Sequence, residues 1–440
     1  MNNKKWMAIL LGGIMAASLA APCSVSAAEK TTLTFWHAMG GTNGEVLQQI
    51  VDDFNASQDE IEIKAEYQGT YDDTITKLKA AMQSESGLPD VCQMYDVGTK
   101  FMYDSGAVIP VEDKFESTGY DKSSVMDVIS SYYTVEGKQY AMPFNVSTPM
   151  LYYNKDVFEA AGLDPETPPT TYDEVLEDAK KIVESGAAPV GYSQAIYGWF
   201  FEQQLAGLGV TYGNNDNGRT EAVTAVDFDS NGGGLKVFDM WKKLYDSGYF
   251  EDYGTTTADT QTAFFSGQVG MIIESTAILK NAVDSSPFEV GTGYLPRIEQ
   301  NDEGGVIIGG GSLWLTDTGN EANEDAAWKF IEYITTPDVQ AKWSMGTGYF
   351  AINEKAYETD DMKAYLEENP NFMTAINQLK DSPVNCNTAG VLSGVQTEAR
   401  LTFNEIMPQV YDGKLTTQDA VDQLAASVNK AIENYNESIK

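Results

Sequence analysis

The stretch TTLTFWHAMGGTNGEVLQQIVDDFNASQDEIEIKAEY, residues 31–67, contains the pattern that decides the fold class. Apolar and polar side chains alternate over 31–37 and again over 61–67, which predicts two β-strands. Residues 45–54 between them predict a helix, because apolar side chains recur at helical spacing, at Val46, Ile50, Val51 and Phe54. A strand, a helix and a strand in this order favour an α/β fold.

The same alternation continues beyond this stretch. Residues 72–84 predict a second helix and residues 88–95 a third strand, so the first part of the chain favours a largely parallel sheet. A second unit begins near Asn145, with a strand over 150–153. The run Thr171-Tyr-Asp-Glu174 has the spacing of a capping box and predicts the start of another helix.

Further helices are predicted towards the C-terminus. Residues 235–247 and 325–333 have helical spacing, and Pro337 lies where a proline would end the second of these helices. Thr416 is placed to cap the last helix. The chain has no internal repeat, and its length of 440 residues suggests two or three domains.

Residues 1–28 have the features of an export signal: two lysines near the start, an apolar run over 6–21, and small residues at the cleavage site. The apolar run is shorter than the roughly 20 residues that span a membrane. An alternative is a lipid anchor at Cys23, but Pro22 directly before it disfavours lipoprotein processing. We therefore expect an exported protein, located in the periplasm or at the cell surface.

The composition excludes several classes of function. The chain has 28 Lys and Arg against 65 Asp and Glu, and this net charge of −37 disfavours nucleic acid and anionic membranes as partners. His37 is the single histidine and the cysteines are Cys23, Cys92 and Cys386, so no His/Cys zinc cluster is expected, and no Ser-His-Asp triad unless His37 serves in it. We expect no metal and no cofactor. An oxidising compartment would permit pairing of Cys92 with Cys386, but Cys92 lies in an apolar run and two separate thiols are expected.

Two glycine-rich stretches, 40–44 and 309–312, are candidates for a binding loop. Either could hold an anion or let the backbone approach a ligand or a strand closely, but 40–44 lacks the ending of a nucleotide P-loop, and a tight turn is the favoured interpretation. The run from Asp227 begins like a calcium loop, but Phe238 stands where a bidentate Glu is required. No carboxylate pair stands out for glycoside hydrolysis, because sequence spacing does not report the distance across a sugar.

Three aromatic residues, Tyr71, Trp199 and Tyr349, lie in turn-like or junction positions and not within the apolar stripe of a helix. Aromatic faces with a few polar groups commonly line pockets for sugars and polyols. Arg400 is the only arginine between Arg297 and the C-terminus. Taken alone, a surface ion pair is the simplest interpretation of Arg400.

Five short runs occur together along the chain: Phe35-Trp-His37, Phe54-Asn55, Leu88-Pro-Asp-Val91, Tyr152-Tyr-Asn-Lys155 and Ala160-Ala-Gly-Leu-Asp-Pro165. As a set they resemble the extracellular solute-binding proteins, group 1, of ABC importers, a family that includes the maltose-binding protein. Further runs at 95–99, 143–149, 308–314 and 347–349 resemble a branch of this family that binds glycerol phosphate. The similarity extends over nearly the whole chain after the export signal.

The resemblance implies an α/β, two-lobed periplasmic-binding-protein fold of the Venus-flytrap type, with the ligand cleft between the lobes. Residues 29–144 with about 305–345 would form lobe I, and about 145–304 with 346–440 would form lobe II. The lobes would close over a small-molecule ligand, and subunits of an ABC permease would recognise the closed form. The resemblance also implies a monomer without catalytic residues.

The resemblance further implies a set of ligand-binding residues. They are Tyr71, Asp96, Ser147, Trp199, Ser275, Gly310, Tyr349 and Arg400. Arg400 would bind phosphate oxygens, and the other donors would complete the hydrogen bonds of the anion. Asp96 stands where the family member has Glu and would accept a bond from a ligand hydroxyl, while Ile196 replaces a second pocket tryptophan.

The expected ligand is sn-glycerol-3-phosphate or a glycerophosphodiester. One alternative is a neutral sugar or oligosaccharide, which would use the same aromatic residues and Asp96. A third possibility, from another class, is a secreted glycosidase, whose activity would depend on particular carboxylates.

Overall fold

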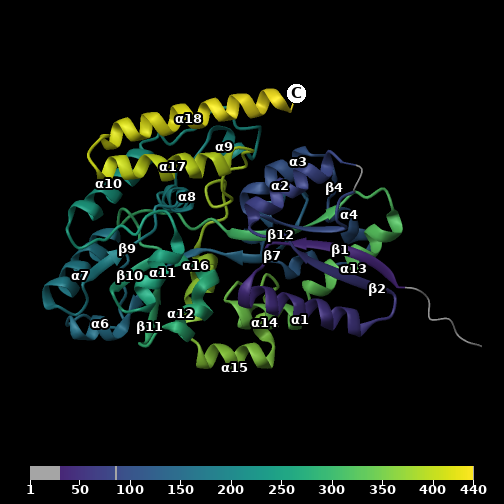
Figure 1. Cartoon of the computed structure of the whole chain (residues 1–440), viewed down its shortest axis with the longest axis horizontal. Helices are drawn as coiled ribbons and strands as arrows, with labels where there is room; N and C mark the ends of the chain where they lie inside the picture. The colour runs from purple at the N-terminus through teal and green to yellow at the C-terminus, as the bar shows by residue number, and fades with distance from the viewer. Residues whose placement is uncertain (1–29, 85–86, 440) are drawn as a thin grey trace, which may run out of the picture.

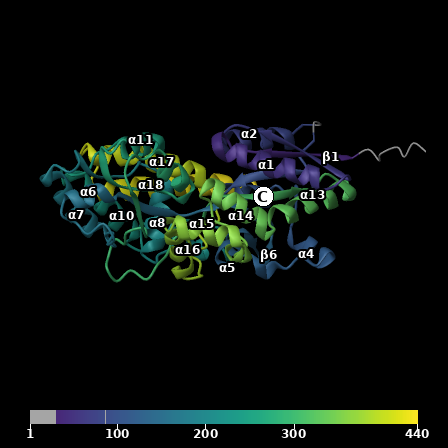
Figure 2. The same ribbon diagram turned by 90° about the horizontal axis from the view of Figure 1, so that it is seen from below.

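Two large β-sheets and the small pair β5 (Thr134–Val135) and β6 (Lys138–Gln139) make up the strands of the chain, which the computed structural model describes over residues 30–84 and 87–439. Figure 1 shows two lobes side by side, one around the N-terminal strands and the other around the middle of the chain. Figure 2, turned by 90°, shows the same separation. The expected export signal, residues 1–28, lies outside the described residues.

The first lobe is built on a six-stranded sheet in the order β2-β1-β3-β12-β4, with β7 also paired to β12. Its strands are β1 (Thr31–His37), β2 (Ile61–Tyr67), β3 (Val91–Tyr95), β4 (Val108–Ile109), β7 (Met142–Ser147) and β12 (Gly309–Thr316). Strand β1 is parallel to β2 and β3, whereas β12 is antiparallel to β3, β4 and β7. The prediction of a largely parallel sheet is right only for β1 to β3, because β12 enters from the second lobe.

The helices of the first lobe begin at residues that the sequence only partly indicated. They are α1 (Gly41–Ser57), α2 (Tyr71–Met82), α3 (Thr99–Asp104), α4 (Glu112–Thr118), α5 (Asp127–Ser130), α13 (Glu321–Ile334) and α14 (Pro337–Thr347). Helix α1 starts at Gly41, so the glycine-rich stretch forms its first turn and not a separate loop. Pro337 lies beyond the end of α13 and is also the first residue of α14. A proline fits the first position of a helix because the backbone N–H that it lacks would have no partner within the helix there.

The second lobe is built on a four-stranded sheet in the order β11-β8-β10-β9. Its strands are β8 (Pro149–Asn154), β9 (Val190–Ser193), β10 (Val269–Ser275) and β11 (Val290–Gly293). Strand β8 is antiparallel to β10 and β11, while β9 is parallel to β10. The predicted capping box is confirmed, since Thr171 accepts a bond from the backbone of Glu174 and the Glu174 side chain bonds back to the Thr171 backbone.

Helices cover this second sheet and connect its strands. They are α6 (Lys155–Ala160), α7 (Tyr172–Ser185), α8 (Gly198–Gly207), α9 (Asn214–Gly218), α10 (Gly233–Asp246), α11 (Thr257–Phe265), α12 (Leu279–Ser285) and α16 (Asn371–Asp381), with α15 (Asp360–Glu368) between the lobes at the lower edge of Figure 1. The last two helices, α17 (Gln396–Tyr411) and α18 (Thr417–Ser438), pack on α8 and α10. Thr416 caps α18 as predicted, because its hydroxyl accepts a bond from the Asp419 backbone.

The chain passes between the two sheets more than once. Strand β7 ends at Ser147 and β8 begins at Pro149, so the first crossing consists of Thr148 alone. The second crossing lies between β11 and β12. The third lies between α14 and α16, because α14 packs on α1 of the first lobe and α16 packs on β11 of the second. In this structure β7 therefore stays in the first sheet for three residues beyond the boundary expected at residue 144.

Contacts away from the sheets also join the lobes. The Tyr435 hydroxyl in the last turn of α18 donates to Asp104 Oδ2 on α3 at 2.6 Å.

Cys92 is buried and Cys386 half-buried, and both thiols are free, as expected. Within the described ranges, none of the helices combines the length and the apolar character needed to cross a membrane.

Candidate functional site

A cluster of three charged side chains lies where the lobes meet. Arg400 on α17 donates from Nε to Glu202 Oε1 and from Nη2 to Glu202 Oε2, both at 2.7 Å, and Glu202 lies on α8 of the second lobe. Nη2 also donates to Asp96 Oδ2 at 2.8 Å, and Asp96 follows β3 in the first lobe. Arg400 is only 7% exposed, so the ion pair expected at the surface is instead buried and spans the lobe boundary.

Burial and charge act against each other in this cluster. Burial lowers the pKa of Arg400, but the charges of Asp96 and Glu202 outweigh it and hold that pKa well above its ordinary value. Burial raises the pKa of Glu202, although Arg400 and the amide of Gln396, which donates to Glu202 Oε1 at 2.7 Å, counteract the shift. Among residues 30–84 and 87–439, no hydrogen bond engages Arg400 Nη1. Its two N–H groups remain available to an acceptor.

A chain of buried amides fixes Tyr71, the first residue of α2. Asn145 on β7 donates to the Tyr71 hydroxyl oxygen at 2.7 Å, and Gln93 on β3 donates to Asn145 Oδ1 at 2.7 Å. The backbone N–H of Ala38 donates to Gln93 Oε1 at 2.8 Å. The Tyr71 ring also lies parallel to Tyr95, with centroids 5.2 Å apart. Buried, satisfied networks of this kind hold a side chain in one orientation.

Tyr349 lies against the same group. Its ring is parallel to Trp343 on α14, with centroids 5.6 Å apart. Burial raises the pKa of Tyr349, while hydrogen bonding with Asn145 and Tyr71 lowers it, and burial likewise raises the pKa of Tyr71 well above its usual range. Both phenols therefore stay protonated and can donate to an anion or to a ligand oxygen.

The glycine-rich stretch 309–312 forms the start of β12 beside this network. Gly310 has φ of +91°, and a Cβ there would lie 1.9 Å from the Asn145 carbonyl oxygen. A Cβ on Gly309 would lie 2.7 Å from Cζ2 of Trp199, so the indole of the second lobe rests on this backbone. Close approach of the backbone to its neighbours, one of the interpretations left open above, is the reason for these glycines.

The remaining predicted positions differ in how closely they join the cluster. Trp199, in the first turn of α8, is buried, and its Nε1 has no hydrogen-bond partner in the described structure. Ser147 pairs with Gly309 across β7 and β12. Ser275 ends β10 beside Pro149, and its hydroxyl accepts a bond from the Ala277 backbone at 3.2 Å. Ile196 is fully buried, as an aliphatic core side chain.

The sequence did not indicate four further residues of this region: Asn145, Tyr197, Glu202 and Gln396. Burial raises the pKa of Tyr197 to about 12, and the charges of Arg400, Asp96 and Glu202 all act on its hydroxyl. One feature of the sequence could have indicated Glu202: it is an acidic residue in the otherwise largely apolar run 198–206. Gln396 precedes Arg400 by four residues, so both lie on one face of α17.

Asp96 and Glu202, the acidic side chains of the cluster, belong to no candidate metal site within the described part of the chain. Over the described ranges, the structure places no group of three or more His, Cys, Asp or Glu side chains so as to hold a metal ion. The polar groups that converge are instead one guanidinium, two carboxylates, two phenols and amides. Such a set can bind a small molecule that carries hydroxyls or a single anionic group.

A family model of the bacterial extracellular solute-binding proteins matches residues 49–374 of the chain. The chain belongs to this family. The sn-glycerol-3-phosphate-binding periplasmic protein UgpB of Escherichia coli K12 is 31% identical to this solute-binding protein over 417 residues, which cover 93% of this chain and 94% of the relative. The resemblance inferred from short runs is thus confirmed.

Solved structures confirm the two-lobed fold of this solute-binding protein. UgpB of Mycobacterium tuberculosis, in complex with glycerophosphocholine, has a TM-score of 0.79 at 20% identity and covers 93% of this chain and 100% of its own. The cyclic α-maltosyl-1,6-maltose binding protein of Arthrobacter globiformis has a TM-score of 0.77 at 25% identity, with coverage of 92% and 100%. The protein is accordingly the substrate-binding component of an ABC importer, which binds a small molecule and delivers it to a permease.

Proposed function

We propose that this solute-binding protein takes a glycerol phosphate, either sn-glycerol-3-phosphate or a glycerophosphodiester, in the cleft between its lobes. The observation that carries the proposal is the buried guanidinium of Arg400, whose Nη1 is not engaged by Asp96 or Glu202. Arginine binds phosphate oxygens through strong, charge-assisted hydrogen bonds. The 31% identity to a relative named for sn-glycerol-3-phosphate binding supports the same ligand.

The other side chains fit this role by their chemistry. The protonated phenols of Tyr71 and Tyr349 would donate to the phosphate, and Ser147 and the backbone of Gly310 lie beside them. Asp96 would accept a bond from a glycerol hydroxyl. An entering anion would raise the pKa of Glu202 further.

A neutral sugar or oligosaccharide is the second candidate, and one observation favours it. Asp96 and Glu202 already balance the charge of Arg400, so the cluster as a whole does not demand an anion. The indole of Trp199 and the parallel rings of Tyr71 and Tyr95 would offer flat faces to a sugar ring.

Isothermal titration calorimetry with sn-glycerol-3-phosphate, glycerophosphocholine and maltose separates these candidates. We expect saturable one-to-one binding of the phosphorylated compounds and no measurable heat with maltose. Binding of maltose alone would establish the second candidate. Chromatography of the ligand after long incubation should recover it unchanged, since we propose a carrier without turnover; formation of a product would contradict that.

We further propose that the protein is exported, with residues 1–28 as the signal. The relative from Escherichia coli is periplasmic by name, which supports this location. Mass spectrometry of the protein purified from its own cells tests the proposal. A mature chain that begins at Glu29 supports a soluble form, whereas a lipid-modified Cys23 would indicate an anchored one.

A further inference from the structure

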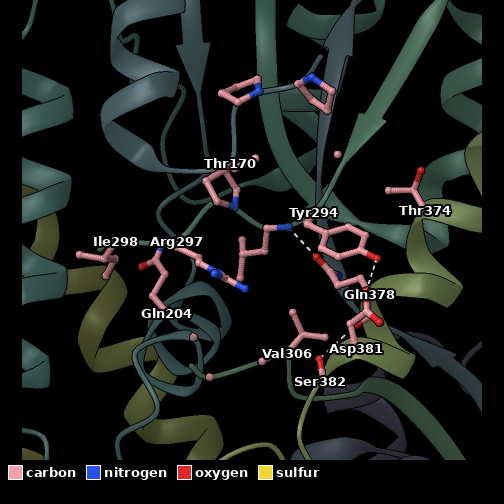
Figure 3. Close-up of a pocket in the computed structure, with 18 of the residues that line it drawn as sticks. Thr170, Gln204, Tyr294, Arg297, Ile298, Val306, Thr374, Gln378, Asp381 and Ser382 are labelled. Atoms are coloured by element: carbon pink, nitrogen blue, oxygen red, sulfur yellow. Dashed lines mark hydrogen bonds between the residues drawn. The ribbon is translucent and has the colours of Figure 1, made fainter. Parts of the chain in front are cut away.

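A cavity of about 490 Å³ opens in the second lobe and shares none of its lining residues with the Arg400 cluster. Four parts of the chain enclose it, as Figure 3 shows: the loop before α7, the C-terminal end of α8, the segment that follows β11, and α16. Residues 304–306 of the crossing that leads to β12 close the remaining side.

Arg297 extends into this cavity in Figure 3. Its backbone is fixed, because its N–H donates to the Thr170 carbonyl and its own carbonyl accepts from the Tyr172 N–H, both at 2.9 Å. Its guanidinium takes part in no hydrogen bond or ion pair with any residue in 30–84 or 87–439, whereas the side chains of Arg219 and Arg400 are both engaged.

The acidic side chains near Arg297 are already engaged by other groups. Asp381 accepts a bond from the Tyr294 hydroxyl at 2.7 Å, and Asp302 accepts one from the Glu299 N–H at 2.8 Å. Glu299 itself pairs with Lys236 at 2.8 Å. The charge of Arg297 acts on Asp302 without an ion pair between them, and among residues 30–84 and 87–439 no partner occupies the guanidinium N–H groups, which can therefore bind an entering anion.

The rest of the lining limits the chemistry of an occupant. The amide of Gln378 is committed to Leu295 and Pro149, at 2.5 and 2.7 Å, and the amide of Gln204 to Tyr172 and Trp241, at 2.7 and 2.6 Å. These bonds use much of the hydrogen-bonding capacity of both amides and leave little of it for the many hydroxyls of a sugar. The Tyr294 ring, 40% exposed, and the rings of Pro168, Pro169 and Pro296 supply an apolar surface instead.

The wall formed by the crossing is firmly held. A Cβ on Gly304 would lie 1.9 Å from the Ala206 carbonyl oxygen, and the Val306 N–H donates to Ser382 Oγ at 3.1 Å. Further along, Ile307 makes two bonds with the Gln203 amide, each at 2.8 Å, and the segment reaches Gly309 at the cleft. The cavity is thus formed by packed backbone and is not a gap between loose loops.

We propose that this cavity is a second ligand site, separate from the cleft, that takes a small monocarboxylate with an apolar ring. The carboxylate pairs with Arg297, and the ring lies against Tyr294 and the prolines. Fluorine NMR with para-fluorobenzoate as the probe tests the site directly and does not depend on the identity of the cleft ligand.

We expect line broadening of para-fluorobenzoate with the wild-type protein and, for Arg297→Gln, affinity weaker by about 10-fold or more, since a charge-assisted bond is lost. Lys180→Gln, which removes an equal charge from the exposed surface of α7, is the matched control and should leave the affinity unchanged. Neutral para-fluorobenzyl alcohol should bind by about 10-fold more weakly than the carboxylate, for the same reason.

Three results would overturn the proposal. One is the absence of broadening by the wild-type protein, and a second is equal affinity of the wild-type and Arg297→Gln proteins for the probe. The third is displacement of the probe by sn-glycerol-3-phosphate or by maltose, which would place it in the cleft. Arg297 is exposed, so an unchanged thermal unfolding midpoint of the variant verifies that its fold is intact.

Discussion

Two arginines join the lobes, one through carboxylates and the other through backbone carbonyls. Arg400 is held by Glu202 of its own lobe and by Asp96 of the other. Arg219, just after α9, donates to the carbonyls of Gly390, at 3.0 Å, and Ala389, and reaches the first lobe through the Tyr132 carbonyl at 2.9 Å. Its guanidinium also lies over the Tyr132 ring, 5.1 Å from the centroid.

The pKa values of the two arginines move in opposite directions. Removal from water lowers the pKa of Arg219 to about 10, and the described residues that counteract this shift are Tyr132 and Cys386 and include no carboxylate. Removal from water also lowers that of Arg400, but Asp96 and Glu202 bring it well above its ordinary value. Charges on side chains can be shared with an entering ligand, whereas backbone carbonyls are fixed by the fold. From this comparison we propose that Arg400 responds to the ligand and that Arg219 has a structural role.

The largest effect is expected for Arg400→Ala. It leaves Asp96 and Glu202 buried without their partner, so the free energy of unfolding should fall by about 3–5 kcal/mol. The affinity for sn-glycerol-3-phosphate should fall by about 100-fold or more, because a buried charged contact is lost. Urea denaturation and calorimetry measure the two quantities. An affinity close to that of the wild-type protein would contradict the assignment of ligand response to Arg400.

A third buried basic side chain, His37, extends the comparison to a group that pairs with no acidic side chain among residues 30–84 and 87–439. Burial lowers its pKa from 6.5 to about 4. The folded state thus favours neutral His37. This preference contributes about 3 kcal/mol to the free energy of unfolding; the contribution is complete above pH 6.5 and is lost as the pH falls towards 4. In His37→Gln the unfolding free energy should depend less on pH in this window.

Direct observation of His37 is simple because the chain has one histidine. Its proton NMR signal should not titrate until the pH falls below about 5, as expected for a buried neutral imidazole. A midpoint near 6.5 would show that burial alone does not suppress the charge of a basic group in this lobe, and would weaken the comparison of Arg219 with Arg400.

Arg219→Ala should affect stability more than binding. The carbonyls of Tyr132, Ala389 and Gly390 lose a donor, and the free energy of unfolding should fall by about 2–3 kcal/mol. The affinity for the cleft ligand should change by less than about 3-fold, because backbone groups do not exchange partners with a ligand. A large loss of affinity together with unchanged stability would reverse the roles given to the two arginines.

The smallest effect is expected for Glu202→Gln. The variant removes one negative charge beside Arg400 and keeps the side-chain volume, so the preference for an anionic over a neutral ligand should rise. A gain of about 1 kcal/mol, roughly 5-fold in the ratio of affinities for sn-glycerol-3-phosphate and glycerol, is expected for a partly screened charge. Calorimetry with both ligands measures the ratio, in which any general loss of packing cancels. A ratio that does not rise would show that Glu202 does not oppose the anion.

Local signals predicted much of the secondary structure. Alternation placed the strands at 31–37 and 61–67, and hydroxyl caps placed the starts of α7 and α18, because each signal needs only residues within one turn or strand. Pro337 was assigned to the end of α13, although the same residue begins α14. Proline is common both just after the end of a helix and at the first position of the next one, and only the path of the chain beyond Pro337 distinguishes these two positions.

The candidate site could be predicted only in part. The resemblance to the family indicated Tyr71, Asp96 and Arg400, and in the structure they lie close together where the lobes meet. It did not indicate Glu202, which is separated from Arg400 by 198 positions and shares no local pattern with it. Asn145, which orients Tyr71 through a chain of buried amides, was missed for the same reason.

The sequence by itself determined the α/β class, the family, the acidic surface and the absence of histidine chemistry beyond His37, because these depend on composition, periodicity and runs of residues. Only the tertiary structure decided that β12 is antiparallel to its neighbours and that Arg400 is shared by two carboxylates across the lobes. It also decided that Arg297 lines a cavity, with its guanidinium free of hydrogen bonds and ion pairs to residues 30–84 and 87–439. Pairing, burial and charge balance depend on distances between residues far apart in the chain, and folding alone sets those distances.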